Sequence, residues 1–410
     1  MKKNKQKDIN LTENDNFDDI DIAQEIDNDE NEKPKNNILH KIKIAIIVII
    51  VIALIIVIAM YITNEDFREY IDVNIFNKQV TEDSLKVIEL NSDDDPTVFA
   101  YSSYIAILSK DTLNLYNSSG NSVQELSINI TNPIIETSKK YIVIAEEDGN
   151  EFYVINDKNI LWQGEVDGNI SKIDINSNGY VSVIVSNSTY NSIVILYDSN
   201  GTELFKTYLP STYAMCSSVS TDNSCLAIGE IDYSGTVLKS NIRIMDIDSA
   251  ETVYQYSTEN NNIITNINYY DKENAVCTFT DFVVSISKTS AEEIYEITDD
   301  TYFVDIEMSD ILAVLEKQSS GLFSYEYNLR LLSLTGNTEN LYILNNSVPK
   351  QVILGENLIA LNYGSEADIV NQYGTLKKKY TSTEQIKDII VGNDIVGIVY
   401  KDEIEIIDIF

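Results

Sequence analysis

The sequence predicts an all-β fold: a β-propeller of eight four-stranded blades, preceded by one transmembrane helix. Three observations support this prediction. An apolar segment of 19 residues lies near the N-terminus. Beyond it, short runs of alternating apolar and polar residues are separated by turns of Asn, Asp, Ser and Gly, which is the period-2 pattern of half-buried strands. One kind of strand recurs at a regular interval, as repeated blades require.

Residues 1–40 are predicted to form a disordered, acidic cytoplasmic tail, because they contain few apolar residues and many charges. The segment 17–29 within this tail reads FDDIDIAQEIDND. Its apolar side chains, Phe17, Ile20, Ile22 and Ile26, suit a short docking motif that folds on a cytoplasmic partner. The alternative is a solvated tail that binds nothing.

Residues 44–62 read IAIIVIIVIALIIVIAMYI, without a charge, a Pro or a Gly. At about 1.5 Å of rise per residue, such a helix crosses the ~30 Å hydrocarbon core of a bilayer. A cleaved signal peptide has a shorter apolar region that lies closer to the N-terminus. The sequence therefore predicts an uncleaved single-pass anchor, with the transmembrane helix at 41–63.

The charges that flank the anchor predict its orientation. Four lysines lie just before it: Lys33, Lys35, Lys41 and Lys43. After it come Asn64, Glu65, Asp66 and Glu69, with Arg68 as the only nearby cation, in a stem predicted at 64–83. Because cations near a span stay on the cytoplasmic side, the N-terminus is expected in the cytoplasm. Residues 84–410 are then expected outside the cell membrane, as an extracytoplasmic propeller.

The repeated strand is the main argument for the propeller. Its copies begin about 36 to 50 residues apart, which is the spacing of four-stranded blades. A second apolar strand follows each copy, a more polar strand comes next, and a strand that precedes each copy completes four. The eight copies are YIAILSK (104), YIVIAEE (141), YVSVIVS (180), CLAIGEI (225), NAVCTFT (274), ILAVLEK (311), LIALNYG (358) and DIVGIVY (394).

The two ends of the repeat region predict how the ring closes. The eighth unit stops after three strands, and SLKVIEL at 84–90 is an isolated strand before the first unit. We expect this strand to supply the missing outer strand of the last blade, which removes an exposed sheet edge. Seven blades are the alternative, because the division of residues 263–350 is the least distinct.

Two turns carry a resemblance to known propellers. SSVSTDNSCLAI at 217–228 and IDINSNGYVSVIV at 173–185 resemble the S-x-D-G-x-x-L-A turn of WD40-like repeats, placed between the first and second strands of a blade. The quinoprotein-like propellers look similar too. The chain also resembles the single-pass, membrane-anchored propeller proteins of clostridial-type Gram-positive bacteria. Propellers of this kind mostly bind other proteins through loops on one face.

The charge excludes one class of partner. The formal net charge is -36, and the residues after Lys43 include 21 Lys and Arg against 54 Asp and Glu. Such a surface repels nucleic acid, which requires clustered cations. It favours basic partners or cations, or it serves solubility alone.

Few residues suit catalysis. The only histidine is His40, before the anchor, so the propeller has no Ser-His or Cys-His pair and no His-ligated metal. After the anchor the only arginines are Arg68, Arg243 and Arg330, and the last two occupy matching strands as expected for paired surface cations. The sequence therefore predicts a protein that is not an enzyme and has no cofactor.

One loop is a calcium candidate. Asp174, Asn176 and Asn178 match the start of an oxygen-ligand calcium loop, but position twelve is Val185 where the full motif has Glu. The competing interpretation is a plain turn, in which Gly179 takes a positive φ.

The three cysteines, Cys216, Cys225 and Cys277, are predicted to be buried thiols, because they form no CxxC pair and three cannot all pair within one chain.

The functional expectation is a protein-interaction scaffold or sensor in the cell envelope, with a protein partner outside the membrane. An aromatic patch ringed by acids on one face would favour it. The alternatives are a module for a glycan or small ligand and, less favoured, a carbohydrate-active enzyme. Convergent carboxylates in the central channel, one with a raised pKa, would favour the enzyme.

Overall fold

The computed structural model describes residues 36–63, 71, 86–258, 261–308, 310–321, 324–336, 338–344, 347–407 and 409. The predictions for the tail at 1–35, including the docking motif at 17–29, and for all but residue 71 of the stem lie outside these residues. The chain divides into two units, one of which contains the N-terminal helix, and each is described by itself.

The N-terminal helix, α1 (Asn36–Thr63), is apolar on all sides. Its part between Lys41 and Tyr61 is long and apolar enough to cross a membrane, and none of it is buried. The predicted long apolar helix is therefore confirmed, and it is consistent with a membrane anchor or a signal sequence.

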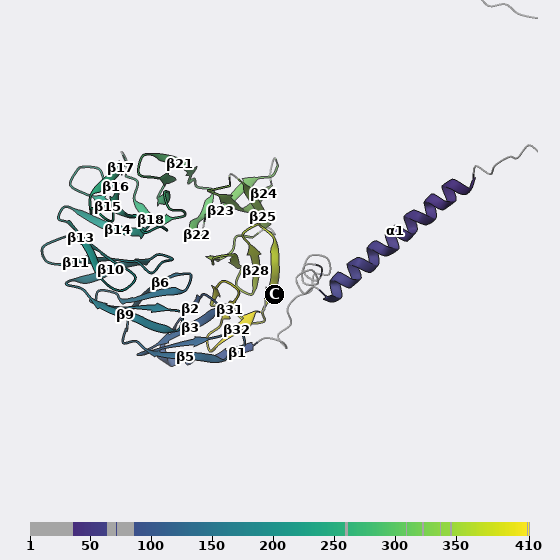
Figure 1. The fold of residues 1–410 in the computed structure, drawn as a ribbon, viewed down its shortest axis with the longest axis horizontal. Helices are drawn as coiled ribbons and strands as arrows, with labels where there is room; N and C mark the ends of the chain where they lie inside the picture. The colour runs from purple at the N-terminus through teal and green to yellow at the C-terminus, as the bar shows by residue number, and fades with distance from the viewer. Residues whose placement is uncertain are drawn as a thin grey trace, which may run out of the picture. The chain divides into compact units, whose positions relative to one another are not determined.

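The strands form eight antiparallel four-stranded sheets, arranged as the blades of a ring (Figure 1). Blade 1 contains β2 (Thr97–Tyr101), β3 (Tyr104–Ser109), β4 (Thr112–Tyr116) and β5 (Ser122–Ser127). Blade 2 contains β6 (Pro133–Ser138), β7 (Tyr141–Glu146), β8 (Glu151–Asn156) and β9 (Asn159–Glu165). Blade 3 contains β10 (Asn169–Ile175), β11 (Val181–Ser186), β12 (Ser192–Tyr197) and β13 (Glu203–Leu209). Blade 4 contains β14 (Thr212–Val219), β15 (Cys225–Asp232), β16 (Lys239–Asp246) and β17 (Thr252–Ser257).

The second half of the ring repeats this order. The prediction of eight blades is confirmed, also over residues 263–350, where the division into blades was least distinct in the sequence. Blade 5 contains β18 (Ile264–Tyr269), β19 (Ala275–Phe279), β20 (Phe282–Ile286) and β21 (Ala291–Glu296). Blade 6 contains β22 (Thr301–Met308), β23 (Ile311–Ser319), β24 (Tyr325–Ser333) and β25 (Glu339–Leu344). Blade 7 contains β26 (Gln351–Leu354), β27 (Leu358–Asn362), β28 (Glu366–Asn371) and β29 (Leu376–Thr381). Blade 8 contains β30 (Asp388–Val391), β31 (Val396–Val399) and β32 (Glu403–Ile407).

The ring closes as the sequence predicts. The strand β1 (Lys86–Glu89), which is followed by a short 3-10 helix, η2 (Ser92–Asp94), pairs antiparallel with β32 and becomes the outer strand of blade 8. In the register of this pair, Ile88 lies opposite Ile404. The first and last strands of the ring therefore belong to one sheet, which is a complete four-stranded blade.

The hydrophobic core lies between the blades. Each of eight apolar clusters joins two neighbouring blades in the described part of the ring. The cluster at the closure contains Ile88 and Ile406 of blade 8 and Ile105 of blade 1. The second and third strands have nearly continuous buried runs because they are covered by a blade on each side. The fourth strands are more exposed, which explains their more polar sequences.

The first strand of each blade lies at the centre of the ring. Contacts between neighbouring blades join β6 to β10, β10 to β14 and β14 to β18. The turn at 220–224 connects β14 to β15, so the prediction that it separates the first and second strands of the fourth unit is confirmed. Asn223 in this turn has a φ of 60°, a left-handed conformation that Asn tolerates better than most residues.

Candidate functional site

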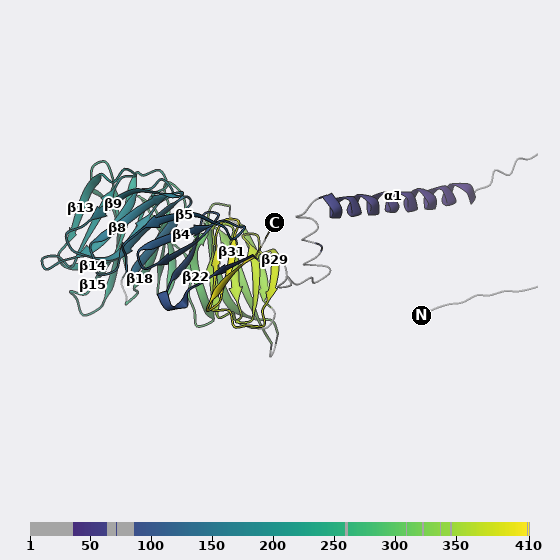
Figure 2. The same ribbon diagram turned by 90° about the horizontal axis from the view of Figure 1, so that it is seen from below.

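The strands run between two faces of the ring, as Figure 2 shows from another direction. Because the strands of a blade alternate in direction, the turns from second to third strands and the connections between blades all lie on the same face. We call this the loop face. Over blades 2 to 4 it consists of residues 147–150, 166–168, 187–191, 210–211 and 233–238.

Four tyrosines of blades 3 and 4 form a strip on the loop face. The ring centres of Tyr190 and Tyr208 are 4.8 Å apart, and those of Tyr213 and Tyr233 are 5.3 Å apart. The amide of Asn191 joins the two pairs by donating a hydrogen bond to the Tyr233 hydroxyl at 3.0 Å. We call these four side chains the tyrosine strip.

Most of the tyrosine strip is open to solvent. The exposed fractions of Tyr208, Tyr213 and Tyr233 are 50%, 44% and 47%, and Met215 beside Tyr213 on the same strand is 42% exposed. Rings held against one another lose little conformational freedom when they bind, and tyrosine is enriched where proteins meet. The strip is therefore an exposed, amphipathic surface whose rings are held against one another.

An open pocket lies on the same face, at blade 2. Its walls are the turn at 148–150 and the connection at 165–169, and its carboxylates are those of Asp148, Glu165 and Asp167. The amide of Asn150 donates to Glu165 at 2.8 Å. We call this the acidic pocket. It continues into blade 3 because Asn169 pairs with Ser186, directly before the turn that carries Tyr190.

The two arginines of the propeller, Arg243 and Arg330, are each paired with carboxylates of their own blade. In blade 4, Arg243 contacts Glu230 through Nε at 2.8 Å and Nη2 at 3.3 Å. Thr212 donates to the same carboxylate at 2.7 Å. Glu230 is only 1% exposed, so the pair is partly buried. The expected pairing of the arginines is confirmed.

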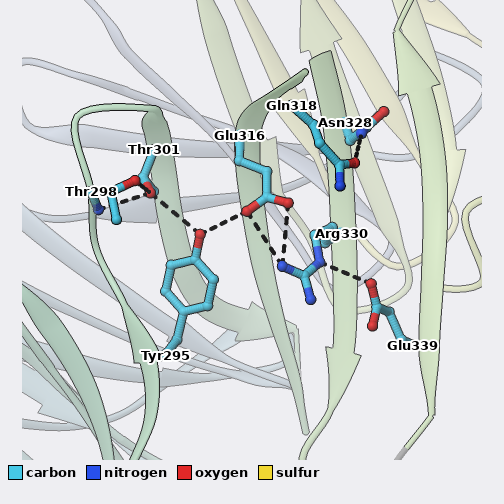
Figure 3. Close-up of polar contacts among 8 residues, drawn as sticks. All are labelled: Tyr295, Thr298, Thr301, Glu316, Gln318, Asn328, Arg330 and Glu339. Carbon is cyan, nitrogen blue, oxygen red and sulfur yellow. Dashed lines mark hydrogen bonds and ion pairs between the residues drawn. The ribbon is translucent and has the colours of Figure 1, made fainter. Parts of the chain in front are cut away.

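Blade 6 repeats this arrangement, as Figure 3 shows. Arg330 contacts Glu316 at 3.2 Å and Glu339 at 2.9 Å. The hydroxyl of Tyr295, from the outer strand of blade 5, donates to Glu316 at 2.9 Å and so links two blades (Figure 3). Both arginines lie on third strands, and Glu230 and Glu316 lie on second strands, so the network is a repeated structural feature.

Burial raises the pKa of three carboxylates on inner strands. Glu136 on β6 contacts Lys172 on β10 at 3.3 Å, and burial raises the pKa of Glu136. The charge of Asp305 raises the same pKa further, although it comes from blade 6, on the opposite side of the ring. Both residues belong to first strands, which lie at the centre of the ring. Burial also raises the pKa of Asp305, and it raises that of Asp174 to about 8.

The raised pKa of Asp174 predicts a pH-dependent stability. Its ordinary value is 3.8, so the folded protein holds a proton there that the unfolded chain releases. This contribution is complete below pH 4 and is lost as the pH rises through about 8. Asp174→Asn removes this contribution. The free energy of unfolding of the variant, relative to that of the wild type, should therefore rise by up to about 1.4 kcal/mol per pH unit across this window. Urea unfolding of both proteins between pH 5 and 9 measures the difference, and parallel curves would contradict the assignment.

The structure places two of the calcium candidates, Asn176 and Asn178, in the turn between the first and second strands of blade 3. The side-chain oxygen of Asn176 accepts from the backbone N–H groups of Asn178 and Tyr180, both at 3.0 Å. The amide nitrogens of Asn176 and Asn178 donate to the matching turn of blade 4, at Ser220 and Thr221. Gly179 has a φ of 85°, as expected for the turn.

Asp174 belongs to β10, directly before this turn, and its buried Oδ2 has no hydrogen-bond partner. Among the residues that the structure describes, no three His, Cys, Asp or Glu side chains are placed to hold a metal ion. The calcium site stays a prediction. The three cysteines are buried free thiols, which confirms that prediction. In the register of β14 and β15, Cys216 lies opposite Gly229 rather than Cys225.

Sequence reasoning did not find the tyrosine strip or the acidic pocket. The chain contains 26 tyrosines, and those of the strip are spread from 190 to 233 without a common motif. One signal was available. Each of these tyrosines lies in or beside a connection at the same end of its blade, so the predicted topology already placed the four side chains on one face.

Comparisons with known proteins agree with this fold. A family model described as a family of unknown function (DUF5711) matches residues 75–409. No curated protein sequence matches the chain. Among solved structures, Sqt1 from Chaetomium thermophilum, bound there to the N-terminus of the ribosomal protein L10, is 12% identical with a TM-score of 0.50, covering 80% of this chain and 100% of that chain.

Two further solved structures are similar at 12% identity. BamB from Moraxella catarrhalis has a TM-score of 0.46, with 80% of this chain and 98% of that chain covered. The β-propeller domain of Cps50 (Swd1) from Myceliophteria thermophila has a TM-score of 0.44, with 79% and 100% covered. At such identities the likeness concerns the fold alone. The resemblance predicted from the turns is confirmed at that level.

Proposed function

This chain belongs to the DUF5711 family of unknown function, and from its loop face we propose that it is a membrane-anchored binding module that holds a protein partner outside the membrane. The observation that carries the proposal is the tyrosine strip. It presents two pairs of rings on one face of a rigid ring, and the acidic pocket lies on the same face. Aromatic side chains at the centre of a contact, with polar residues at its rim, are typical of protein interfaces.

The anchor supports the location of this activity. The helix α1 is long and apolar enough to span a bilayer. The lysines before it favour a cytoplasmic N-terminus, so the propeller lies on the other side. The inventory of side chains favours binding over catalysis, because the propeller has no histidine and both of its arginines have carboxylate partners.

Replacement of the strip tests the proposal. The tagged full-length protein is crosslinked in native membranes, and the crosslinked partner is quantified. Tyr208→Ser and Tyr233→Ser together should lower the yield at least about tenfold, because exposed tyrosines at interface centres contribute most of the binding free energy. Their effect on the thermal midpoint should be small, since both side chains are half exposed.

Tyr373→Ser is the matched control. Tyr373 is 64% exposed, and it lies in the turn between β28 and β29, on the opposite face. Its replacement should leave the crosslinking yield unchanged. Equal loss from Tyr373→Ser and from the strip variant, or no loss from either, would contradict the proposal.

The inner-strand carboxylates favour a second candidate, a glycan or small cationic ligand at the central axis. Glu136 and Asp305 lie on the first strands of opposite blades, at the centre of the ring, and burial raises the pKa of both. Binding of a glycan panel to the full-length protein, with Glu136→Gln as the matched variant, tests this candidate. Binding that does not respond to this replacement would contradict it.

A further inference from the structure

We propose that the segment bound by the tyrosine strip is basic, and that it places a Lys or Arg side chain in the acidic pocket. This inference rests on the proposed function and names the chemistry of the partner. The strip and the pocket lie on the same face of neighbouring blades, and Tyr190 packs against the apolar cluster that includes Val166 of the pocket wall. The pocket's wall at Asn169 pairs with Ser186, the next turn carries Tyr190, and Asn191 joins that turn to Tyr233 of blade 4.

The charges of the pocket are not neutralised within the molecule. Asp148, Glu165 and Asp167 are all exposed, and none of the ion pairs in the described part of the chain involves them. Glu147 adds a fourth carboxylate beside the pocket, and its contact there is with the amide of Asn132. A cation that a partner brings to this surface is attracted by these carboxylates, and it does not have to displace a cation of the protein itself.

A cationic side chain fits this surface better than a metal ion does. The carboxylates do not converge, since no three of them in the described ring are placed to hold a metal. A guanidinium or ammonium group on a flexible stem tolerates a spread of acceptors, and it also stacks on tyrosine rings. The surface therefore favours a polypeptide segment in which cations alternate with apolar or aromatic residues.

Two synthetic peptides test the inference on the full-length protein in uncharged detergent. One repeats Arg-Leu-Gly and the other repeats Glu-Leu-Gly at the same length, and fluorescence anisotropy measures binding. We expect the Arg peptide alone to bind, with an affinity that falls about tenfold between low and moderate salt. The pair Asp148→Asn and Asp167→Asn should weaken binding at least about tenfold, because it removes two of the attracting charges.

The control removes the same charge from the opposite face. Asp248 is exposed in the turn between the third and fourth strands of blade 4. Glu273 is exposed in the turn between the first and second strands of blade 5. The pair Asp248→Asn and Glu273→Gln should leave the affinity within about twofold. Equal binding of both peptides, or equal weakening by both pairs of replacements, would overturn the inference.

Its failure is distinguishable from failure of the proposed function. If the native partner still crosslinks in a way that depends on the tyrosine strip, while Asp148→Asn with Asp167→Asn leaves the yield unchanged, the partner docks but is not held by a cation. If the strip variant has no effect on crosslinking, the proposed function itself is wrong.

Discussion

Ile88→Asp is expected to destabilise the propeller by about 4 kcal/mol or more, because it places a charge inside the cluster that closes the ring. Ile88 is 4% exposed and packs among the isoleucines of blades 8 and 1. The change removes apolar burial, and it leaves a carboxylate without a cation. The β1 strand would leave β32, and blade 8 would lose its outer strand.

Val87→Asp is the matched control for this prediction. Val87 is the neighbouring residue on the same strand, and it is 46% exposed because its side chain points to the other side of β1. A charge there reaches water, so the expected loss is below about 1 kcal/mol. Guanidinium unfolding of the two full-length variants measures the difference. Equal midpoints would show that β1 does not close the ring.

Glu230→Ala should lower the free energy of unfolding by about 3 to 5 kcal/mol, because it leaves the partly buried Arg243 and Thr212 without their common acceptor. Glu230 is 1% exposed and receives three hydrogen bonds from these two residues. Removal of one partner from a buried pair is more destabilising than removal of both. The double change Glu230→Leu with Arg243→Met should therefore recover most of the loss.

The blade 6 network provides the control. Glu339 contacts Arg330 at 2.9 Å but its side chain is 50% exposed, so Glu339→Ala should cost below about 1 kcal/mol (Figure 3). Urea unfolding of the four proteins gives the free energies. A loss for Glu230→Ala that does not exceed that for Glu339→Ala would contradict the structural role assigned to the pair.

Most of the fold was predictable from the sequence because its signal is local and repeated. The second strand of every blade is buried on both sides, and its apolar run therefore recurs eight times. The role of β1 was predictable from the missing strand at the other end of the ring. The register shifts in the inner strands of blades 3 to 6 have no sequence signal, since they arise from backbone geometry.

The candidate site was much less predictable, because it depends on which loops the ring brings together. Tyr190 and Tyr233 belong to different blades, and only the pairing of neighbouring blades joins them through Asn191. Glu136 and Asp305 are still further apart in the chain, and only closure of the ring places their strands on opposite sides of its centre. Among the predicted calcium ligands, the structure gives Asn176 and Asn178 contacts to the next blade that spacing alone does not indicate.

The measurement that tests the account most directly is crosslinking from a single position of the tyrosine strip in intact cells. Tyr233→Cys introduces an exposed thiol, whereas the three native cysteines are buried. A membrane-impermeant thiol reagent with a photoactivatable group should label this variant and crosslink a discrete protein. Tyr373→Cys should be labelled without giving that product. Absence of labelling would contradict the orientation, and the same products from both positions would contradict binding through the strip.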